Sequence, residues 1–184
     1  MKLPEVQKSK PIMRLFESRK SSREFQSKEL EMQEISNILW AAFGISREDG
    51  RRTAPTARNI QDIELYVVNQ TAVYLYKPET NELTEIVKGD FRKNTGLQDF
   101  VGIAPLEIVI VSDHSKMEVD EIIKTSYSCM NTGFVSENIY LYCASENLAT
   151  VTRGSIERVE LAQILKLKQE QKIILVQSVG YPKE

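Results

Sequence analysis

The chain has 184 residues, a formal net charge of −2, and 41% apolar and 27% charged residues. This length suits one domain with its own core, so we expect a single domain over 1–184. The slightly acidic balance argues against nucleic acid as the main partner, and no apolar run approaches the roughly 20 residues that span a membrane.

The amino-terminal third predicts two helices separated by a basic loop. A helical apolar pattern that starts at Ile12 indicates a short first helix, and SRKSSREF at Ser18–Phe25 follows as its exit loop. Apolar residues at i, i+3, i+4 and i+7 predict a stronger helix over Met32–Phe43, which Gly44 is expected to end in a left-handed conformation. In Pro55–Gln61, proline stands at a position suited to the first turn of a helix.

The middle of the chain is rich in β-forming residues. We expect a hairpin, a third, half-exposed strand and later an interior strand, at Ile63–Val68, Ala72–Lys77, Glu82–Val87 and Pro105–Asp113. Between the last two strands, GDFRKNTGLQDF predicts a short helix capped by Asp90.

The carboxyl-terminal part predicts a long helix, an amphipathic helix and a final strand. The long helix should run from about Val119 or Glu121 to Asn147. It is apolar on several sides around Phe134–Cys143, which is typical of a buried helix. The segment ERVELAQILKL forms the amphipathic helix, and KIILVQSVGY closes the chain as a central strand. The residues expected to face inward from the amphipathic helix are Val159, Ala162, Ile164 and Leu165.

Helices and strands are mixed along the chain but do not alternate strictly. This order favours an α+β fold over a doubly wound parallel sheet.

The octet SRKSSREF allows two readings. Arginine forks and serine hydroxyls suit the oxygens of a bound phosphate. A solvated basic turn explains the same composition, and the octet alone favours this simpler reading.

Motifs for other chemistries are absent from the sequence. The chain lacks GxGxxG, GxxxxGK[ST] and GxSxG, and no cluster has metal-ligand spacing, so we expect no metal site. His114 is expected on the surface in the polar turn SDHSK, and Cys129 and Cys143 are expected to be buried free thiols. If the protein is an enzyme, a cofactor therefore carries the chemistry.

Gly133 is unusual because it lies in the middle of the predicted long helix, where glycine costs about 0.5–1 kcal/mol relative to alanine. Two explanations stay open: the close approach of another helix, or a flat ligand against the backbone. A near-apolar helix with such a glycine also hints at a dimer interface, and Tyr140 and Tyr142 suit a core or an interface equally well.

Four segments, in order along nearly the whole chain, resemble the nitroreductase-like FMN-dependent family. SRKSSREF and the following ILWAAFGIS resemble its Arg-x-Ser-x-Arg-x-Phe and Leu-Trp-Ala-Ala-x-Gly motifs, and RTAPTARNIQ resembles its Pro-Ser-Ala-x-Asn-x-Gln segment. NTGFVSENIYLYCASENLATV is similar to its central helix with a Gly-Leu-x-Thr-like turn, and VQSVGYPK resembles its terminal strand. Several positions depart from the family pattern. Asn131 stands where Asp is expected, Glu137 where Gln is expected and Thr56 where Ser is commoner, and Glu146–Asn147 replaces the usual Gly before Leu148.

The resemblance implies an α+β fold in which helices flank a mostly antiparallel sheet. It also implies a homodimer that holds two FMN molecules at the subunit interface. By position, Arg19 and Ser21 would bind the FMN phosphate with Lys20 close by, and Arg23 would face the pyrimidine edge of the flavin ring.

The resemblance implies three further groups of cofactor-binding residues. The other subunit would contribute Pro55, Thr56, Ala57 and Asn59. The ring would lie along Thr150, Val151 and Thr152, with backbone amides near flavin N5. Additional charge near the phosphate would come from Arg153 and Lys183.

The implied activity is that of an FMN-dependent oxidoreductase. NAD(P)H would transfer a hydride to flavin N5, and a nitroaromatic, quinone or similar acceptor would then be reduced in the same place, in a ping-pong scheme. Two alternatives stay open: an FMN-dependent dehydrogenase of a peptide or small molecule, and a non-catalytic flavin-binding dimer. The chain as written is expected in the cytoplasm, or in the periplasm if it is the mature part of a cleaved precursor.

Overall fold

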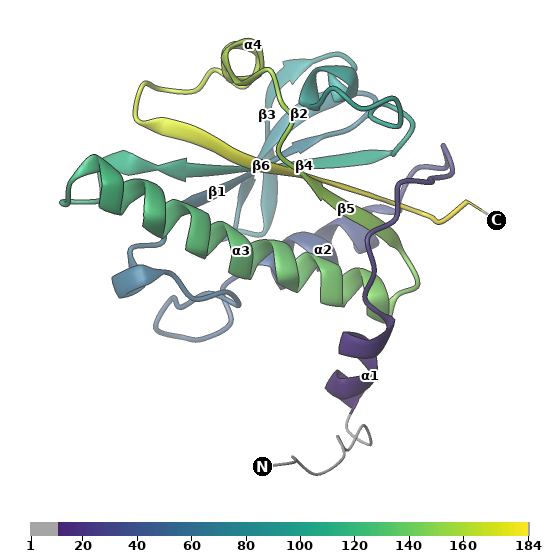
Figure 1. Cartoon of the computed structure of the whole chain (residues 1–184), viewed down its shortest axis with the longest axis horizontal. Coiled ribbons are helices and arrows are strands. Elements are labelled where there is room, and N and C mark those ends of the chain that lie inside the picture. The colour runs from purple at the N-terminus through teal and green to yellow at the C-terminus, as the bar shows by residue number, and fades with distance from the viewer. Residues whose placement is uncertain (1–10, 184) are drawn as a thin grey trace, which may run out of the picture.

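The computed structural model describes residues 11–183, and its centre is one six-stranded sheet (Figure 1). The strands are β1 (Ile63–Val68), β2 (Ala72–Lys77), β3 (Glu82–Lys88), β4 (Leu106–Asp113), β5 (Ala149–Arg153) and β6 (Gln171–Gly180). They lie in the order β3-β2-β1-β4-β6-β5, and every neighbouring pair is antiparallel. The predicted α+β fold with an antiparallel sheet is confirmed.

Helices cover both faces of this sheet (Figure 1). The α-helices of the described chain are α1 (Pro11–Ser18), α2 (Met32–Phe43), α3 (Glu121–Ser145) and α4 (Arg158–Ile164). Its 3-10 helices are η1 (Ala57–Asn59), η2 (Arg92–Thr95) and η3 (His114–Lys116). Helices α2 and α3 lie on one face, and α4 lies on the other. Within residues 11–183, no helix is long and apolar enough to cross a membrane.

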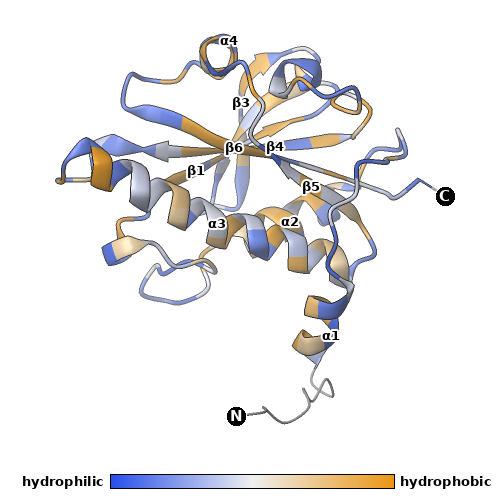
Figure 2. Cartoon of the chain, in the orientation of Figure 1, coloured by the Kyte–Doolittle hydropathy of each residue, from blue (hydrophilic) through white to orange (hydrophobic). Residues whose placement is uncertain are grey.

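Two hydrophobic cores lie on opposite faces of the sheet. Along β1 and β4, Leu65 and Ile108 belong to the core under α2 and α3, whereas their neighbours Tyr66 and Val109 belong to the core under α4. Successive side chains of a strand point to opposite faces, so a strand covered on both sides needs apolar residues throughout. This explains the unbroken apolar run in β4, and Figure 2 shows apolar residues along β6 and on α2.

Most predicted elements are confirmed with small changes in their bounds. Helix α2 and the β1–β2 hairpin have the predicted bounds, and β6 is central because it lies between β4 and β5. Helix α3 ends at Ser145, two residues before the predicted end, and Asn147 adopts a left-handed φ of 56°. The prediction that α3 is buried on several sides is wrong, because Phe134 is 50% exposed.

Gly44 ends α2 for a reason other than the predicted one. Its φ of −70° and ψ of 165° are extended, not left-handed. A Cβ atom at this position would lie 2.4 Å from a ring carbon of Trp40. Glycine is therefore needed here for close approach to the Trp40 ring.

The predicted inward face of α4 is partly wrong. Val159 is 77% exposed, whereas Leu161, which was not among the predicted inward residues, is fully buried. Leu165 is buried four positions after Leu161, so the inward face is centred on this i, i+4 pair. Ala162 and Ile164 are partly buried beside it.

Three local predictions fail at loops and short elements. Pro55 precedes a single 3-10 turn instead of opening a helix, and β5 was expected only as a turn. The segment after Asp90 forms only η2, where Asp90 accepts a hydrogen bond from the Arg92 N–H at 3.2 Å. Short elements of this kind are set by tertiary contacts more than by local propensity.

Burial of the chemically active side chains also differs from expectation. His114 is 3% exposed and lies in the interior, not on the surface. Of the two cysteines expected to be buried thiols, only Cys143 is buried, and Cys129 is exposed.

Candidate functional site

The basic arm, residues 18–26, runs along the outer edge of the sheet beside β5. The Ser22 N–H donates to the Thr150 carbonyl at 2.9 Å, and the Gln26 N–H donates to the Tyr181 carbonyl at 2.9 Å. The arm thereby covers an edge strand that would otherwise present unpaired backbone groups. The backbone that carries the cationic side chains is fixed in place as a consequence.

Tyr140 of α3 joins the basic arm to β5. Its hydroxyl lies 2.9 Å from Ser21 Oγ and accepts a hydrogen bond from the Thr152 N–H at 3.0 Å. The guanidinium carbon of Arg19 lies 5.1 Å from the centroid of the same ring, within the range of a cation–π contact. Tyr140 therefore contacts Arg19 and Ser21 of the arm and Thr152 of β5. The family resemblance assigns all three of these residues to one cofactor site.

A cavity of about 390 Å³ adjoins this contact. Lys20 and Lys183 line it together with Thr150 and the buried Cys143. Burial raises the pKa of the Cys143 thiol to about 12. The thiol is therefore protonated near neutral pH and is not a nucleophile. The groups left to bind a ligand are the two lysines and several hydroxyls, although the carboxylate of Glu24 also lines the cavity.

The cations of the basic arm are available to an anion. Among residues 11–183, no carboxylate forms an ion pair with Arg19, Lys20 or Arg23. Lys20 and Arg23 are exposed, and Arg19 is half-buried against Tyr140. Guanidinium, ammonium and hydroxyl donors suit phosphate oxygens, so the residues present fit the phosphate group of FMN.

Arg153 faces the interior instead of the cavity. Its guanidinium forms an ion pair with Glu107 and donates to the Thr95 carbonyl at 3.0 Å and to Ser178 Oγ at 3.1 Å. Burial raises the pKa of the Glu107 carboxyl to about 7, against the effect of Arg153. The phosphate-binding role implied for the Arg153 side chain is not retained, because each guanidinium nitrogen is engaged in this interior network.

The site loop, residues 55–61, carries the other implied residues between α2 and β1. Pro55 and Asn59 are exposed. Thr56 Oγ1 accepts a hydrogen bond from the Gln61 N–H at 2.9 Å. The Ala57 N–H donates to Oδ1 of Asn131 on α3 at 2.9 Å, so this loop is also tied to the long helix.

A single chain does not bring the site loop and the basic arm together. The loop contacts α3 at Asn131 and the arm contacts it at Tyr140, nine positions later. In an α-helix these positions are about 13 Å apart along the axis and on opposite sides of it.

The outward face of α3 carries exposed apolar side chains, together with the half-buried Glu137. Ile123, Met130 and Phe134 are 36%, 51% and 50% exposed, and helical spacing places them in one stripe. Gly133 lies next to the stripe, and a Cβ atom added there would meet nothing within 4 Å. Within residues 11–183, no helix therefore approaches Gly133 closely enough to require a glycine at this position.

Two functional candidates were not assigned a role by sequence reasoning. The sequence leaves Tyr140 open between core and interface, and it does not point to Asp62, whose carboxylate accepts a hydrogen bond from Asn131 Nδ2 at 2.7 Å behind the site loop. A tyrosine in an amphipathic helix and an aspartate before a strand carry no local signal of function. Within residues 11–183, no three His, Cys, Asp or Glu side chains gather into a possible metal site.

Comparison with known proteins places these observations in a family. Residues 16–181 match the Nitroreductase family. A curated nitroreductase-like protein of Methanocaldococcus jannaschii is 31% identical over 92% of this chain and 90% of its own length. The crystal structure of a nitroreductase-like protein from Ralstonia eutropha JMP134 matches with a TM-score of 0.90 and 37% identity, over 99% of this chain and 89% of that one.

A third match shares the fold at lower identity. It is a nitroreductase-like protein of Desulfovibrio desulfuricans, crystallised in complex with FMN, with a TM-score of 0.71 and 18% identity over 96% of this chain and 88% of that one. The family match spans most of the sequence, and a relative above 30% identity aligns over nearly its whole length. The chain therefore belongs to the Nitroreductase family and is an oxidoreductase of that family.

Proposed function

We propose that the protein is an FMN-dependent oxidoreductase that takes a hydride from NAD(P)H and reduces a nitroaromatic, a quinone or a similar acceptor in a ping-pong scheme. The observation that carries this proposal is the basic arm, which Tyr140 holds against β5 and whose cations pair with no carboxylate of residues 11–183. Family membership and the FMN complex of the Desulfovibrio relative support the choice of cofactor.

The phosphate of FMN would bind at the basic arm. Arg19 offers a planar fork for two phosphate oxygens, and the Tyr140 ring restricts its guanidinium. Lys20 and Lys183 line the adjoining cavity and add charge, and Ser21 adds a hydroxyl donor. Binding by several donors on a covered strand edge costs little further ordering of the chain.

The flavin ring would lie along Thr150–Thr152, with Arg23 at its pyrimidine edge. Thr150 and Val151 are buried in β5, which gives this side of the site a rigid wall. A fixed cation at the pyrimidine edge stabilises negative charge that develops there. When bound, FMN supplies the two-electron chemistry, so the chain needs to supply only position, field and exclusion of water.

A second copy of the chain would complete each site. The site loop and the basic arm lie too far apart on α3 to surround one ligand within a single chain. The apolar stripe on α3 lies between them and offers a surface that a partner would bury. In such a homodimer, Pro55, Thr56, Ala57 and Asn59 of one subunit would reach the flavin held by the arm of the other.

Flavin absorbance tests the proposal directly. The purified protein, as isolated or after incubation with FMN, should carry oxidised-flavin absorbance, and anaerobic mixing with NADH or NADPH in a stopped-flow instrument should bleach it. A protein that never retains FMN would overturn the proposal. A protein that binds FMN but is reduced by neither nicotinamide would be a flavin-binding dimer or a dehydrogenase of another donor.

A further inference from the structure

A buried polar network connects the site loop to the start of α3. Asn131 Nδ2 donates to Asp62 Oδ1 at 2.7 Å, and Ser112 Oγ donates to Asp62 Oδ2 at 2.6 Å. Ser112 Oγ lies 2.8 Å from Ser128 Oγ, which lies 2.9 Å from Nε2 of His114. Each of these five side chains is at most 3% exposed, so the network is almost completely removed from water.

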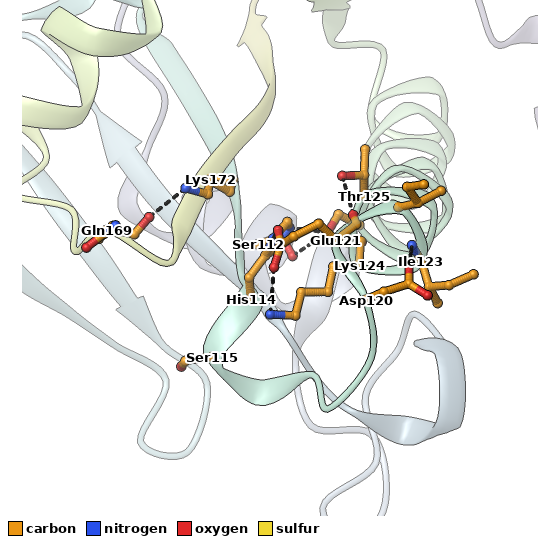
Figure 3. Close-up of polar contacts among 12 residues, drawn as sticks. Ser112, His114, Ser115, Asp120, Glu121, Ile123, Lys124, Thr125, Gln169 and Lys172 are labelled. Carbon is orange, nitrogen blue, oxygen red and sulfur yellow. Dashed lines mark hydrogen bonds and ion pairs between the residues drawn. The ribbon is translucent and has the colours of Figure 1, made fainter.

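The end of this network near the surface is visible in Figure 3. His114 and Ser112 leave the end of β4 and face the first turns of α3, where Glu121 pairs with Lys124 at 2.9 Å. His114 Nδ1 lies 3.5 Å from Glu121 Oε2. The hydrogen-bonded network therefore runs from His114, close to the exposed Glu121, to the backbone of the site loop at Ala57.

The site loop has a conformation that its own sequence does not favour. Arg58, Asn59 and Gln61 have φ values of 54°, 56° and 52°. Asparagine tolerates this left-handed region, but it costs residues such as Arg58 and Gln61 roughly 1–2 kcal/mol each, so the surroundings must hold the loop in place.

The Ala57 N–H bond to Asn131 ties the middle of this loop to α3. The end of the loop is held separately at Gln61, whose carbonyl accepts from Lys116 Nζ at 3.0 Å and whose side-chain oxygen accepts from Arg52 Nε at 3.0 Å.

Asp62 decides which way the Asn131 amide points. In its carboxylate form Asp62 only accepts hydrogen bonds, so the NH₂ group of Asn131 must face it. The carbonyl oxygen of Asn131 is then directed at the Ala57 N–H. Ser112 occupies the second carboxylate oxygen and fixes the orientation of the carboxyl group.

We propose that Asp62 and Asn131 are positioning residues that hold the strained site loop in the shape that receives the ring of a partner-bound flavin. This inference rests on the proposed function for the identity of the ligand, but the shape of the loop is a property of the chain itself. Asp62 orients Asn131, and Asn131 holds Ala57 in place. The pair acts on the ligand through the loop and touches no reacting atom.

The pair can be tested by exchanging its members. Asn131→Ala removes the acceptor for the Ala57 N–H, and Asn131→Asp places two carboxylates in hydrogen-bond contact. The double variant Asp62→Asn/Asn131→Asp restores the hydrogen bond between the two side chains with its polarity reversed. The carboxylate then at position 131 would accept from both the Ala57 N–H and the amide then at position 62.

The expected effects on cofactor binding differ between the single and double variants. We expect each single Asn131 variant to weaken FMN binding roughly tenfold or more, because the middle of the loop loses its bond to α3 or a second carboxylate is placed against Asp62. The double variant should recover FMN binding to within about threefold of the wild type, since each hydrogen bond of the pair has a partner again.

Two readouts separate the loop from the cofactor. The Kd for FMN is measured by quenching of FMN fluorescence on apoprotein, and amide hydrogen exchange over residues 56–61 is measured without FMN. The single variants should exchange faster in this segment, and the double variant should exchange as the wild type does. Asn138→Ala serves as the matched control, since its amide ties the same helix to the Ala41 carbonyl at 3.0 Å, away from the site loop.

Unchanged FMN affinity and unchanged exchange in Asn131→Ala would overturn the inference. A double variant that fails to restore either readout, whether folded or not, would overturn it too. If the wild type binds no FMN, the proposed function fails, and the exchange measurement still decides whether the Asp62–Asn131 pair holds the loop.

Discussion

Tyr140 shows how one side chain gives the basic arm its structure. A solvated basic turn would leave Arg19 and Ser21 without fixed partners, but both contact Tyr140, which also binds the β5 backbone. The simpler reading of SRKSSREF as a solvated turn therefore does not describe these two residues. The difference lies in a residue more than a hundred positions away, which no local pattern reveals.

The first prediction at this scale concerns Arg19. Arg19→Ala should raise the Kd for FMN about tenfold or more, since charge-assisted hydrogen bonds contribute roughly 1.5–3 kcal/mol. The melting temperature of the apoprotein should change little, because the cation–π contact with Tyr140 contributes only about 0.5–1 kcal/mol at a half-exposed site. Fluorescence titration measures the first value and thermal denaturation the second.

Arg14→Ala is the matched control for the loss of one positive charge, because Arg14 is exposed on α1 outside the basic arm. If Arg19→Ala binds FMN as tightly as this control, the phosphate lies elsewhere.

The second prediction concerns the buried Glu107. Burial raises the pKa of its carboxyl to about 7, from 4.5 for the unperturbed group. Between these values the native protein holds a proton that the unfolded chain has released, so the free energy of unfolding falls as pH rises through this window. Urea denaturation should show this loss between about pH 4.5 and pH 7, up to about 3 kcal/mol.

Glu107→Gln should be less stable overall, because Arg153 loses its charged partner, but its stability should depend less on pH in the same window. An equal pH slope in the two proteins would mean that Glu107 is ionised throughout and that other groups cause the slope.

At the scale of elements, α3 has three different surfaces. One face packs in the core through residues such as Val135 and Ile139, and its two margins hold the site loop and the basic arm. The outward face carries the apolar stripe of Ile123, Met130 and Phe134. An outward apolar stripe on a surface helix is typical of an interface, so α3 links the proposed cofactor binding to association.

The third prediction tests this outward face. Phe134→Glu should convert the proposed dimer to monomer at micromolar concentration, because it places a charge in the middle of the stripe, and FMN binding should weaken with it. Analytical ultracentrifugation measures the association state, and circular dichroism checks that the monomer stays folded.

Val159→Glu is the control, since Val159 is the more exposed residue and lies on α4, on the other face of the sheet. A Phe134→Glu protein that stays dimeric would place the subunit interface elsewhere.

At the scale of the whole molecule, the proposed site is shared between subunits, and this leads to the fourth prediction. Arg19→Ala damages the arm, and Asn59→Gly removes a loop side chain while keeping its positive φ. Each variant alone should bind FMN weakly. After the two are unfolded and refolded together, random pairing should give about one quarter of the sites an intact arm and an intact loop.

Titration of the mixture with FMN measures this fraction. If the refolded mixture contains no high-affinity FMN sites, each site is formed by residues of one chain only. The variants refolded separately and then combined without exchange provide the baseline.

Much of the fold could be predicted from the sequence, because its elements are long or strongly patterned. The helical period of apolar residues in α2 and the β-forming residues of the β1–β2 hairpin each favour one type of secondary structure. The bounds predicted for these elements agree with the structure. The five-residue β5 and the one-turn η1 were not predicted, since neither is long enough to be stable without its neighbours. Val159 was placed inward wrongly because a seven-residue helix defines its apolar face poorly.

The sequence by itself determined the α+β class, the order of the main elements and the family to which the basic arm and the closing strand point. Those features depend on local period and on motifs of adjacent residues, which one chain carries in full. Only the tertiary structure decided that Arg153 pairs with Glu107, that His114 is buried and that Asp62 and Asn131 contact each other behind the site loop. These facts depend on side chains far apart in the chain, and burial and hydrogen bonding between such groups are set by how the sheet and α3 pack together.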